Sequence, residues 1–213
     1  MALPHFEHEI ALWDQSYVVI GADEVGRGAF AGPVAAGAVI FTPLIIQSYD
    51  QSGIEINDSK KLTPRKREIA YEWIRKNATY SVGFASVSDI NNLGIVNATN
   101  KAYRRCINIV RHKQNGNHFL LVDAFFVPYV PGLIKSRQRP ITHGDMTSMS
   151  IAAASIVAKV ERDQLMDDLS RRERYTAYHW HTNKGYGTKA HRSAISLHGT
   201  TPLHRIDFIH EKK

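Results

Sequence analysis

An apolar run over residues 17–22 is rich in β-branched side chains and leads directly into two adjacent acids, Asp23 and Glu24. A later apolar run also ends in an acid, Asp123. Such runs predict buried strands, and helical patterns lie between them, so the sequence indicates an α/β domain. The predicted strands cover residues 17–22, 34–41, 80–87 and 118–122.

The helices are predicted from caps and from apolar spacing. Thr63 followed by Pro64 is typical of a helix start, because proline fits the first helical position. One predicted helix is apolar nearly all round in its first half, so we expect that half to be buried. The predicted helices are residues 64–77, a longer segment after a cap at Ser88 with apolar positions from Ile95 to Ile109, and the largely apolar helix 151–169; residues 45–57 and the proline-rich stretch 128–140 are predicted as loops.

The C-terminal part of the chain is rich in Arg, Lys and His. We expect it to be a small, mainly helical, basic appendage over residues 169–213 that helps to bind nucleic acid, attached to a domain over residues 1–168 that holds the acids. The net charge of +7 favours an anionic partner such as nucleic acid. A solvated basic surface without such a partner explains the charge equally well.

The sequence also limits where the protein acts. A single cysteine, Cys106, excludes an internal disulfide and fits a reducing cytoplasm. No apolar run approaches the roughly 20 residues that a membrane span needs, and the first residues lack the pattern of a secretory signal. We therefore expect a cytoplasmic protein with no membrane partner. Because no apolar stripe suggests a dimer, we expect a monomer.

Acids at the ends of strands predict a metal site. Ligands of α/β domains gather beyond the carboxyl ends of the strands, where Asp23, Glu24 and Asp123 are expected. Asp145, just before the buried helix, is a fourth candidate. Clustered carboxylates need a cation between them, and Mg²⁺ or Mn²⁺ prefers oxygen ligands. Two such ions can activate a water and hold the leaving oxygen of a phosphodiester. Zinc is disfavoured, because the chain has no Cys cluster and no His-Glu-x-x-His motif.

Simpler interpretations of these acids stay open. Asp123 alone is also typical of a turn, and Asp145 of a helix entry. Adjacent acids in a regular strand point to opposite faces, so Asp23 and Glu24 share a site only if the strand breaks there. The glycine-rich turn that follows them lacks the G-x-G-x-x-G spacing and is followed by a strand, so it is not a dinucleotide loop. Its glycines let main-chain groups approach a ligand, or form a plain hairpin turn.

The motif over residues 21–28, with Gly32 and Pro33, resembles the opening motif of type 2 ribonuclease H, specifically bacterial ribonuclease HII. The blocks that carry the resemblance follow in the order of that family and extend from about residue 17 to 208. They include residues 57–63, 90–95, 122–123, 144–145, 154–163, 184–188 and 204–205. The resemblance implies an RNase H-like fold, a mixed central sheet flanked by helices, with a small C-terminal helical segment.

The resemblance also implies the chemistry. Asp23, Glu24, Asp123 and Asp145 would be the catalytic carboxylates and would bind Mg²⁺ or Mn²⁺, two ions in the catalytic complex. Enzymes of the family cut the RNA strand of RNA–DNA hybrids. They also nick duplex DNA on the 5′ side of a lone ribonucleotide and leave 3′-hydroxyl and 5′-phosphate ends. The expected partners are therefore RNA–DNA hybrids and ribonucleotide-containing duplex DNA.

Substrate-binding residues follow from the same resemblance. The backbone of Gly26, Arg27 and Gly28 would contact the ribose 2′-hydroxyl, and Tyr186 would stack against the sugar next to the junction. A 2′-hydroxyl is absent from DNA, and its recognition does not depend on the base. Candidate phosphate contacts are Lys60, Lys61 and Lys184, although surface solubility explains each lysine equally well.

Two other functions are possible for this sequence. A module that binds RNA–DNA junctions without cutting them is one, but a pure binder gains nothing from acids that repel phosphate. Another nuclease or integrase of the same fold is the second, which the glycine–arginine–glycine turn disfavours. One departure from the family leaves a loop geometry open: Ala124 stands where the family often has glycine, and residues 125–131 are unusual.

Overall fold

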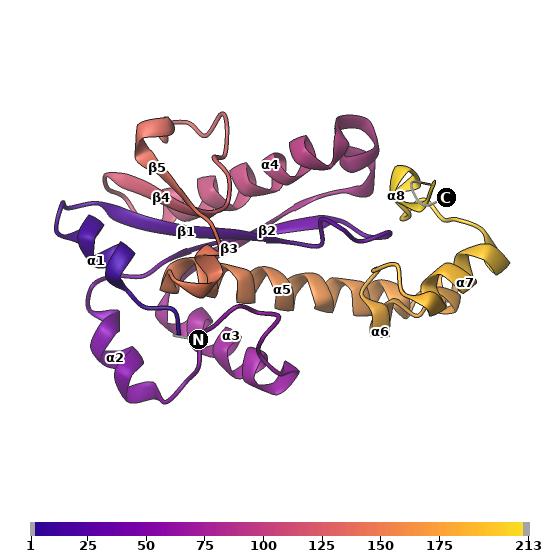
Figure 1. Ribbon diagram of the computed structural model, residues 1–213, viewed down its shortest axis with the longest axis horizontal. Coiled ribbons are helices and arrows are strands. Elements are labelled where there is room, and N and C mark those ends of the chain that lie inside the picture. Colours follow the sequence, from indigo (N-terminus) through magenta and orange to yellow (C-terminus); the bar gives the residue numbers. More distant parts are fainter. Residues whose placement is uncertain (1–2, 211–213) are drawn as a thin grey trace.

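The computed structural model describes residues 3–210 and is built around a five-stranded mixed sheet with strand order β3-β2-β1-β4-β5 (Figure 1). Strand β1 (Val18–Val25) pairs antiparallel with β2 (Val34–Ile40), which pairs antiparallel with β3 (Thr79–Ala85). On its other side β1 runs parallel to β4 (His118–Asp123), and β4 runs parallel to β5 (Gln138–Ile141). The predicted α/β class with a mixed central sheet is confirmed.

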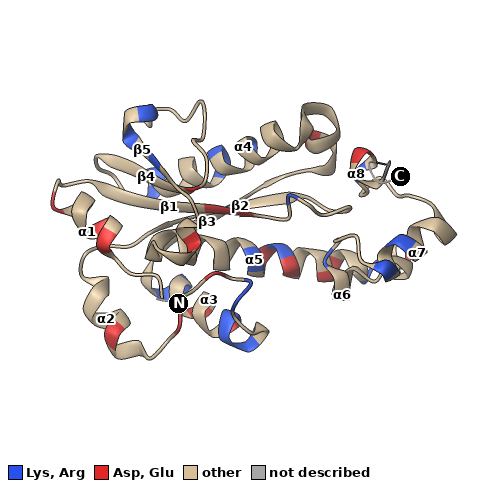
Figure 2. Ribbon diagram, viewed as in Figure 1, with Lys and Arg blue, Asp and Glu red and all other residues tan. Residues whose placement is uncertain are grey.

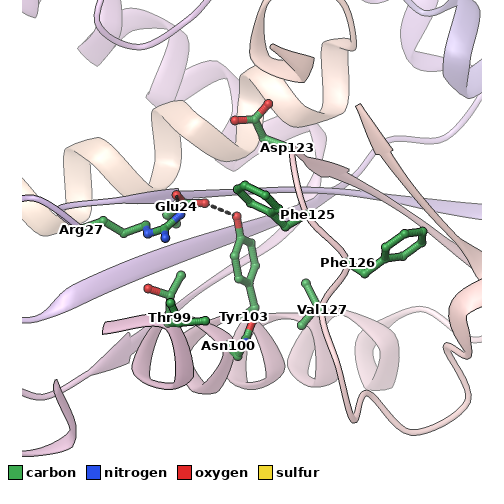
Figure 3. Close-up of a pocket in the computed structure, with 10 residues that line it drawn as sticks. Glu24, Arg27, Thr99, Asn100, Tyr103, Asp123, Phe125, Phe126 and Val127 are labelled. Carbon is green, nitrogen blue, oxygen red and sulfur yellow. Dashed lines mark hydrogen bonds and ion pairs between the residues drawn. The ribbon is translucent and has the colours of Figure 1, made fainter. Parts of the chain in front are cut away.

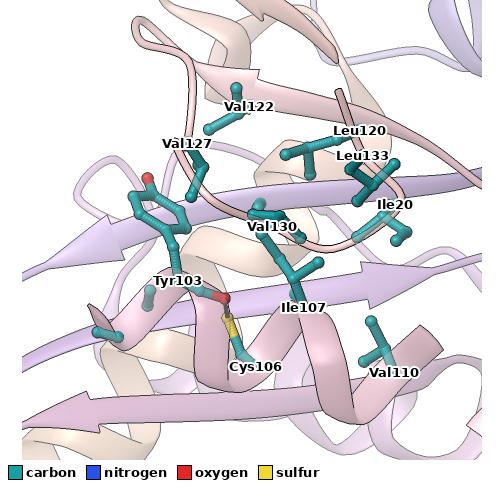
Figure 4. Packing of buried hydrophobic residues seen from close by; sticks show 14 of the residues in the cluster. Ile20, Tyr103, Cys106, Ile107, Val110, Leu120, Val122, Val127, Val130 and Leu133 are labelled. Carbon is teal, nitrogen blue, oxygen red and sulfur yellow. Dashed lines mark hydrogen bonds between the residues drawn. The ribbon is translucent and has the colours of Figure 1, made fainter. Parts of the chain in front are cut away.

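Helices cover both faces of the sheet. Helix α4 (Val87–Lys113) packs on one face, and α5 (Met149–Ser170) packs on the other (Figure 1). Figure 4 shows the core between the sheet and α4, where Ile20 and Leu120 from the strands meet Ile107 from the helix. The remaining helices are α1 (Glu7–Trp13), α2 (Ile45–Ser52), α3 (Pro64–Asn77), α6 (Trp180–Asn183), α7 (Lys189–His198) and α8 (Ile206–His210), with 3-10 turns η1 (Lys135–Arg137), η2 (Gly144–Met146) and η3 (Glu173–Tyr178).

Helix α5 approaches the sheet closely because glycine faces it. A Cβ added to Gly21 of β1 would lie 2.2 Å from the backbone carbonyl carbon of Ser150. A Cβ on Gly37 of β2 would lie 2.3 Å from the carbonyl oxygen of Ala154. Residues 149–158 of α5 are all buried, as their apolar composition predicts. The strand ends are therefore held against the start of α5, where Asp145 lies just upstream.

Two helix predictions need correction. Residues 45–52 form α2, so the loop predicted over residues 45–57 is wrong for residues 45–52 and correct for residues 53–57; the helix is capped by Gly53, whose φ is 64°. The cap of α4 is Ser86 rather than Ser88: its hydroxyl accepts a bond from the Asp89 N–H at 3.0 Å. A reciprocal bond from the Ser86 N–H to the Asp89 carboxylate completes a capping box.

Burial along α4 and the position of β5 also differ from expectation. Ile109 is 44% exposed, because the buried face of α4 continues from Cys106 to Ile107 and Val110 instead. Strand β5 lies inside the stretch predicted as a loop and contains Pro140. It is an edge strand, where a residue without an N–H is tolerated.

After α5 the chain forms η3, α6, α7 and α8, as the predicted mainly helical segment requires. Figure 1 shows these elements beyond one end of the sheet. Of these, η3, α6 and α7 pack around Trp180, together with Met166 of α5 and Ala31 from the turn after β1, whereas Phe208 of α8 packs against the core that α4 covers. Helix α5 continues to Ser170, so the expected boundary between residues 168 and 169 falls in its last turn. That division stays a prediction, and residues 211–213 lie outside the described part of the chain. Across residues 3–210, no helix is both long and apolar enough to cross a membrane.

Candidate active site

The four predicted acids come from three separate elements that meet at one end of the sheet. Asp23 and Glu24 lie near the end of β1, Asp123 is the last residue of β4, and Asp145 lies in η2. The parallel pairing of β1 with β4 stops at Ala22, so the acids follow where the two strands part. The Asp123 carboxylate accepts a bond from the Gly144 N–H at 2.8 Å, which ties the end of β4 to η2.

The pKa shifts show that these acids interact. Asp23 is 7% exposed, and burial, followed by repulsion from Glu24 and Asp123, raises its pKa well above the ordinary value. Burial also raises the pKa of Asp123, and the Glu24 charge adds to the effect. Burial, then repulsion from Asp58 and Asp123, raises the pKa of Asp145 to about 6. These acids are therefore near enough to affect one another, and their role as metal ligands stays a prediction.

The two adjacent acids nevertheless lie on opposite faces of an unbroken strand. Pairing between β1 and β2 continues through Glu24 and Val25, so the strand break that a shared site seemed to require does not occur. Glu24 faces α4: its Oε1 lies 3.2 Å from Arg27 Nη1, and its Oε2 accepts a bond from the Tyr103 hydroxyl (Figure 3). Asp23 faces the α5 side. Asp123, at the open edge between them, interacts with both.

Two residues at the site were missed from the sequence. Tyr103 holds Glu24 from α4, and nothing in its helical spacing distinguishes it from a core aromatic. Asp58 interacts with Asp145 and lies in the loop before α3. Asp58 lies two residues from Lys60, in the family-like block over residues 57–63. Its position near a candidate phosphate contact could have identified it as a site residue from the sequence. Partial burial lowers the pKa of Lys60, but nearby acids outweigh it and raise that pKa; these acids are Asp58, Asp23 and Asp145.

The donor chemistry fits a hard divalent cation. All candidate ligands are carboxylate oxygens, and burial together with repulsion from other acids raises the pKa values of Asp23, Asp123 and Asp145. Within residues 3–210, however, no three Asp, Glu, His or Cys side chains are arranged to hold an ion as they stand. Glu24 gives one oxygen to Arg27 and the other to Tyr103, which accounts for part of this. Coordination would therefore require side-chain rotation.

The glycine turn beside the acids is held by two buried arginines. Arg205 Nη1 donates to the carbonyl oxygens of Gly26 and Arg27 at 2.7 and 2.8 Å, and its Nε donates to that of Gly32 at 3.0 Å. Gly26 has a φ of 85°, and a Cβ there would lie 2.2 Å from Arg162 Nε. Both arginines are 0% exposed. Gly28, in contrast, is exposed and has open space around it. The turn is therefore held on its buried side by the arginines and is accessible to a ligand at Gly28.

Arg162 connects this turn to the C-terminal segment. It donates to the carbonyl oxygens of Pro33, Ala31 and Lys184. Burial lowers the pKa of Arg162 and lowers the pKa of Arg205 to about 9, where the charge of Arg162 adds to the effect. These two residues lie in blocks that carry the family resemblance, but spacing alone did not indicate that they support the turn.

Tyr186 lies on the α5 side of the site. Its ring is half-buried, with the cationic groups of Lys159 and Arg162 at 5.9 and 5.5 Å from the ring centroid. It also interacts with Lys60, so the structure brings Tyr186 near the acids. Its carbonyl oxygen lies 3.0 Å from Nδ1 of the buried His191. The aromatic side chain is thus positioned by a packed core.

The lysine candidates differ in their surroundings. Lys60 is exposed and interacts with the acids. Lys61 is exposed, and its backbone N–H donates to the Asp58 carbonyl. The ammonium of Lys184 pairs with Asp167, away from the acid cluster. Figure 2 shows further Lys and Arg on α3, α5 and α7, so the basic surface is spread beyond these candidates.

A pocket of about 240 Å³ opens on the α4 side of the acids (Figure 3). Glu24, Arg27 and Asp123 contribute its polar lining, so it is continuous with the acid cluster. The other lining residues are Val96, Thr99, Asn100 and Tyr103 of α4 and Phe125, Phe126 and Val127 of the loop after β4.

The chain is similar to known proteins over nearly all of its length. The family model described as Ribonuclease HII matches residues 20–211. A curated Ribonuclease HII from Wolbachia pipientis subsp. Culex pipiens (strain wPip) is 45% identical over 208 residues, which cover 98% of this chain and 97% of that relative.

Solved structures show the same fold at lower identity. The ribonuclease HII of Archaeoglobus fulgidus, solved in complex with PCNA, has a TM-score of 0.69 at 23% identity and covers 92% of this chain and 97% of its own. A ribonuclease HIII named Bst-RNase HIII, solved with Mn²⁺, has a TM-score of 0.71 at 19% identity and covers 90% of this chain and 67% of its own.

Proposed function

This chain belongs to the ribonuclease HII family, and we propose that it is a metal-dependent endoribonuclease that cuts the RNA strand of RNA–DNA hybrids and nicks duplex DNA on the 5′ side of embedded ribonucleotides. The products would carry 3′-hydroxyl and 5′-phosphate ends. The protein would act as a monomer in the cytoplasm, with residues 169–213 as a basic appendage that contacts the nucleic acid.

The observation that carries the proposal is the pairing of two features at one end of the sheet. Burial, and then repulsion from neighbouring acids, raises the pKa values of Asp23 on β1, Asp123 on β4 and Asp145 in η2, and such perturbed groups are typical of functional sites. Beside them lies a turn whose backbone is held from below by Arg205 and is open above at Gly28. A nuclease that recognises ribose needs both features, whereas a binding module needs only the turn.

Asp23, Glu24, Asp123 and Asp145 would hold two Mg²⁺ or Mn²⁺ ions. When bound, these ions would activate a water molecule and stabilise the leaving 3′-oxygen. The protein's own residues prepare this site. The Gly144 N–H fixes the Asp123 carboxylate at the end of β4. Tyr103 and Arg27 bind the two oxygens of the Glu24 carboxylate, and a bound cation would compete with them for these oxygens.

The turn would select the sugar. Main-chain groups of Gly26, Arg27 and Gly28 would contact the 2′-hydroxyl, which is both a donor and an acceptor and is absent from DNA. Arg205 holds this backbone by its bonds to the carbonyls of Gly26 and Arg27, and Arg162 holds the chain that follows it at Pro33. Tyr186 would pack on the neighbouring sugar. Because none of these contacts involves a base edge, the cleavage should show little sequence preference.

Phosphate contacts would add affinity without specificity. Lys60 is exposed next to the acids, and Lys61 follows it in the same loop. Lys184 is paired with Asp167 and would need to exchange that partner for a phosphate. Neutralised phosphates release counterions, so binding should weaken steeply with added salt.

The test uses two labelled duplexes, one all-DNA and one with a single ribonucleotide, each with Mg²⁺ and with EDTA. A single metal-dependent nick 5′ of the ribonucleotide is expected, and the all-DNA duplex should stay intact. Binding of the ribonucleotide duplex without any cut would support a binding module instead. Equal cutting of both duplexes would support another nuclease of the same fold.

A further inference from the structure

Large apolar side chains are exposed on the loop that follows Asp123. Phe125 is 68% exposed and Phe126 is 39% exposed, and both line the pocket beside Glu24 and Arg27. Single exposed apolar residues are common on protein surfaces. A pair of aromatic rings at the rim of a pocket that is continuous with an active site is more informative, because such patches mark binding surfaces.

The backbone that carries Phe125 leaves β4 through a strained residue. Ala124 has a φ of 60°, in the left-handed region where a non-glycine residue is uncommon. Its N–H donates to the Ile141 carbonyl at 3.1 Å, and the Phe125 N–H donates to the Asp123 carbonyl at 2.7 Å. Strain of this kind, roughly 1–3 kcal/mol, persists only where the surroundings fix the conformation, and it gathers at functional sites.

A buried glutamine fixes the rest of this loop. Gln138 of β5 accepts a bond from the Val127 N–H and donates to the Val127 carbonyl, both at 2.9 Å. Its amide also donates to the Leu133 carbonyl at 2.7 Å. The Lys135 ammonium lies 4.9 Å from the centroid of the Phe126 ring. Phe125 is therefore presented to solvent by an ordered backbone and loses little conformational freedom on contact with a ligand.

We propose that Phe125 packs on the sugar face of a nucleotide in the cleaved strand, next to the scissile phosphate, and that the pocket between α4 and residues 125–127 seats that sugar. This inference depends on the proposed function. The pocket is continuous with the acid cluster, because Glu24 and Asp123 line it. A nucleic-acid strand bound at the acids would therefore enter the pocket. Arg27 supplies the positive charge at its rim. Tyr186 lies near the acids on the opposite face of the sheet, so the two aromatic rings would flank them.

A sugar fits this position better than a base. In a duplex the base faces are already stacked and paired. A protein that contacts the 2′-hydroxyl faces the wide, shallow minor groove, where sugars and hydroxyls are displayed. The apolar ring of Phe125 would cover the carbon face of one sugar. Thr99 and Asn100 of α4, on the other wall of the pocket, offer hydrogen bonds to its oxygens.

The first experiment compares Phe125→Ala with Tyr129→Ala. Tyr129 is an aromatic residue of the same loop, is 89% exposed and does not line the pocket. On the duplex with one ribonucleotide, Phe125→Ala should lower kcat/KM about tenfold, mainly through KM, as loss of one stacking contact predicts. Tyr129→Ala should stay within about twofold. Equal activity of both variants would overturn the proposal. Unchanged melting temperatures would show that neither variant unfolds.

The second experiment locates the contact by a double-mutant cycle. Nucleotides on either side of the ribonucleotide are replaced one at a time, either by an abasic tetrahydrofuran, which keeps the sugar, or by a three-carbon spacer, which removes sugar and base. At one position the spacer should lower kcat/KM of the wild type about tenfold, but it should hardly change kcat/KM of Phe125→Ala. The abasic site should lower kcat/KM of both proteins by the same factor. Coupling to the abasic site would instead assign the contact to the base. Absence of coupling at every position would refute it.

Failure of this inference is distinguishable from failure of the proposed function. The cycle is repeated by fluorescence anisotropy with Asp123→Asn, which should bind the duplex without cutting it. A wild type that cuts nothing, combined with a binding cycle that still couples Phe125 to one sugar, would remove the nuclease assignment and keep the contact. A wild type that cuts normally but shows no coupling would keep the nuclease assignment and remove the proposed contact of Phe125.

Discussion

Replacement of Asp145 by asparagine should stabilise the metal-free protein at neutral pH. Burial and neighbouring acids raise the pKa of Asp145 from an ordinary 3.8 to about 6. Ionisation of this carboxyl therefore favours the unfolded state, where the charge is solvated. The loss of folding stability caused by this ionisation is absent below about pH 4, grows as the pH rises from about 4 to about 6, and reaches its full size above about pH 6. Asparagine has no charge to lose, and its amide can still donate to Asp58.

The magnitude follows from the shift. About two pKa units at 1.36 kcal/mol each give roughly 3 kcal/mol. The carboxyl is only half-buried, so solvent screening reduces this to about 1–2 kcal/mol. For a chain of this size, 1 kcal/mol corresponds to roughly 2–4 °C, so the melting temperature should rise by about 2–8 °C.

The assay is thermal unfolding in EDTA at pH 8 and at pH 4.5, with Asp168→Asn as the control, because Asp168 is 70% exposed. Asp145→Asn should melt above the wild type at pH 8, and the difference should shrink at pH 4.5. The control should match the wild type at both values. A variant that is less stable than the wild type at pH 8 would refute the account of the site as a cluster of repelling charges.

Further outcomes are expected. Asp123→Asn should fold, since its amide oxygen still accepts from Gly144, yet show no cleavage; undiminished turnover would contradict its role. Mg²⁺ should raise the melting temperature of the wild type more than that of this variant, and an equal shift would place the ion elsewhere. Arg205→Met should lower stability by about 2–4 kcal/mol in urea, because the carbonyls of Gly26, Arg27 and Gly32 lose their buried donor. Gly21→Ala should cost about 1–3 kcal/mol or more, because its Cβ meets Ser150 of α5; an unchanged midpoint would argue against this packing.

Much of the fold could be predicted because local signals agree with it. The end of β4 at Asp123, the proline start of α3 and the apolar half of α5 all follow from short stretches of sequence, whereas β1 continues to Val25, beyond its predicted end at residue 22. Helix α2 was missed because its residues are mostly polar and its end depends on Gly53. Strand β5 was missed because an edge position, which only the assembled sheet defines, makes Pro140 acceptable.

The acids of the site could be predicted from the sequence, but most of the residues that hold the acids and the glycine turn in place could not. The acids follow strands, and the resemblance places them in one family. The contacts of Arg205 with the turn join residues 178 and 179 positions apart, so no local pattern reports them. The orientation of Glu24 depends on Tyr103 across a face of the sheet. Ala124 is in the left-handed region that favours glycine, and its φ is set by contacts that the sequence does not show.

The dependence of the glycine turn on Arg205 also sets an order of events during synthesis. The ribosome completes Gly26 long before it reaches Arg205, which lies 179 residues further along the chain. At about 5–20 residues per second, the delay is on the order of 10–35 s. During that interval the strands that carry the acids can form, but the turn lacks its donor. The turn would therefore be held in place only after residue 205 has been made, later than the strands whose ends it adjoins.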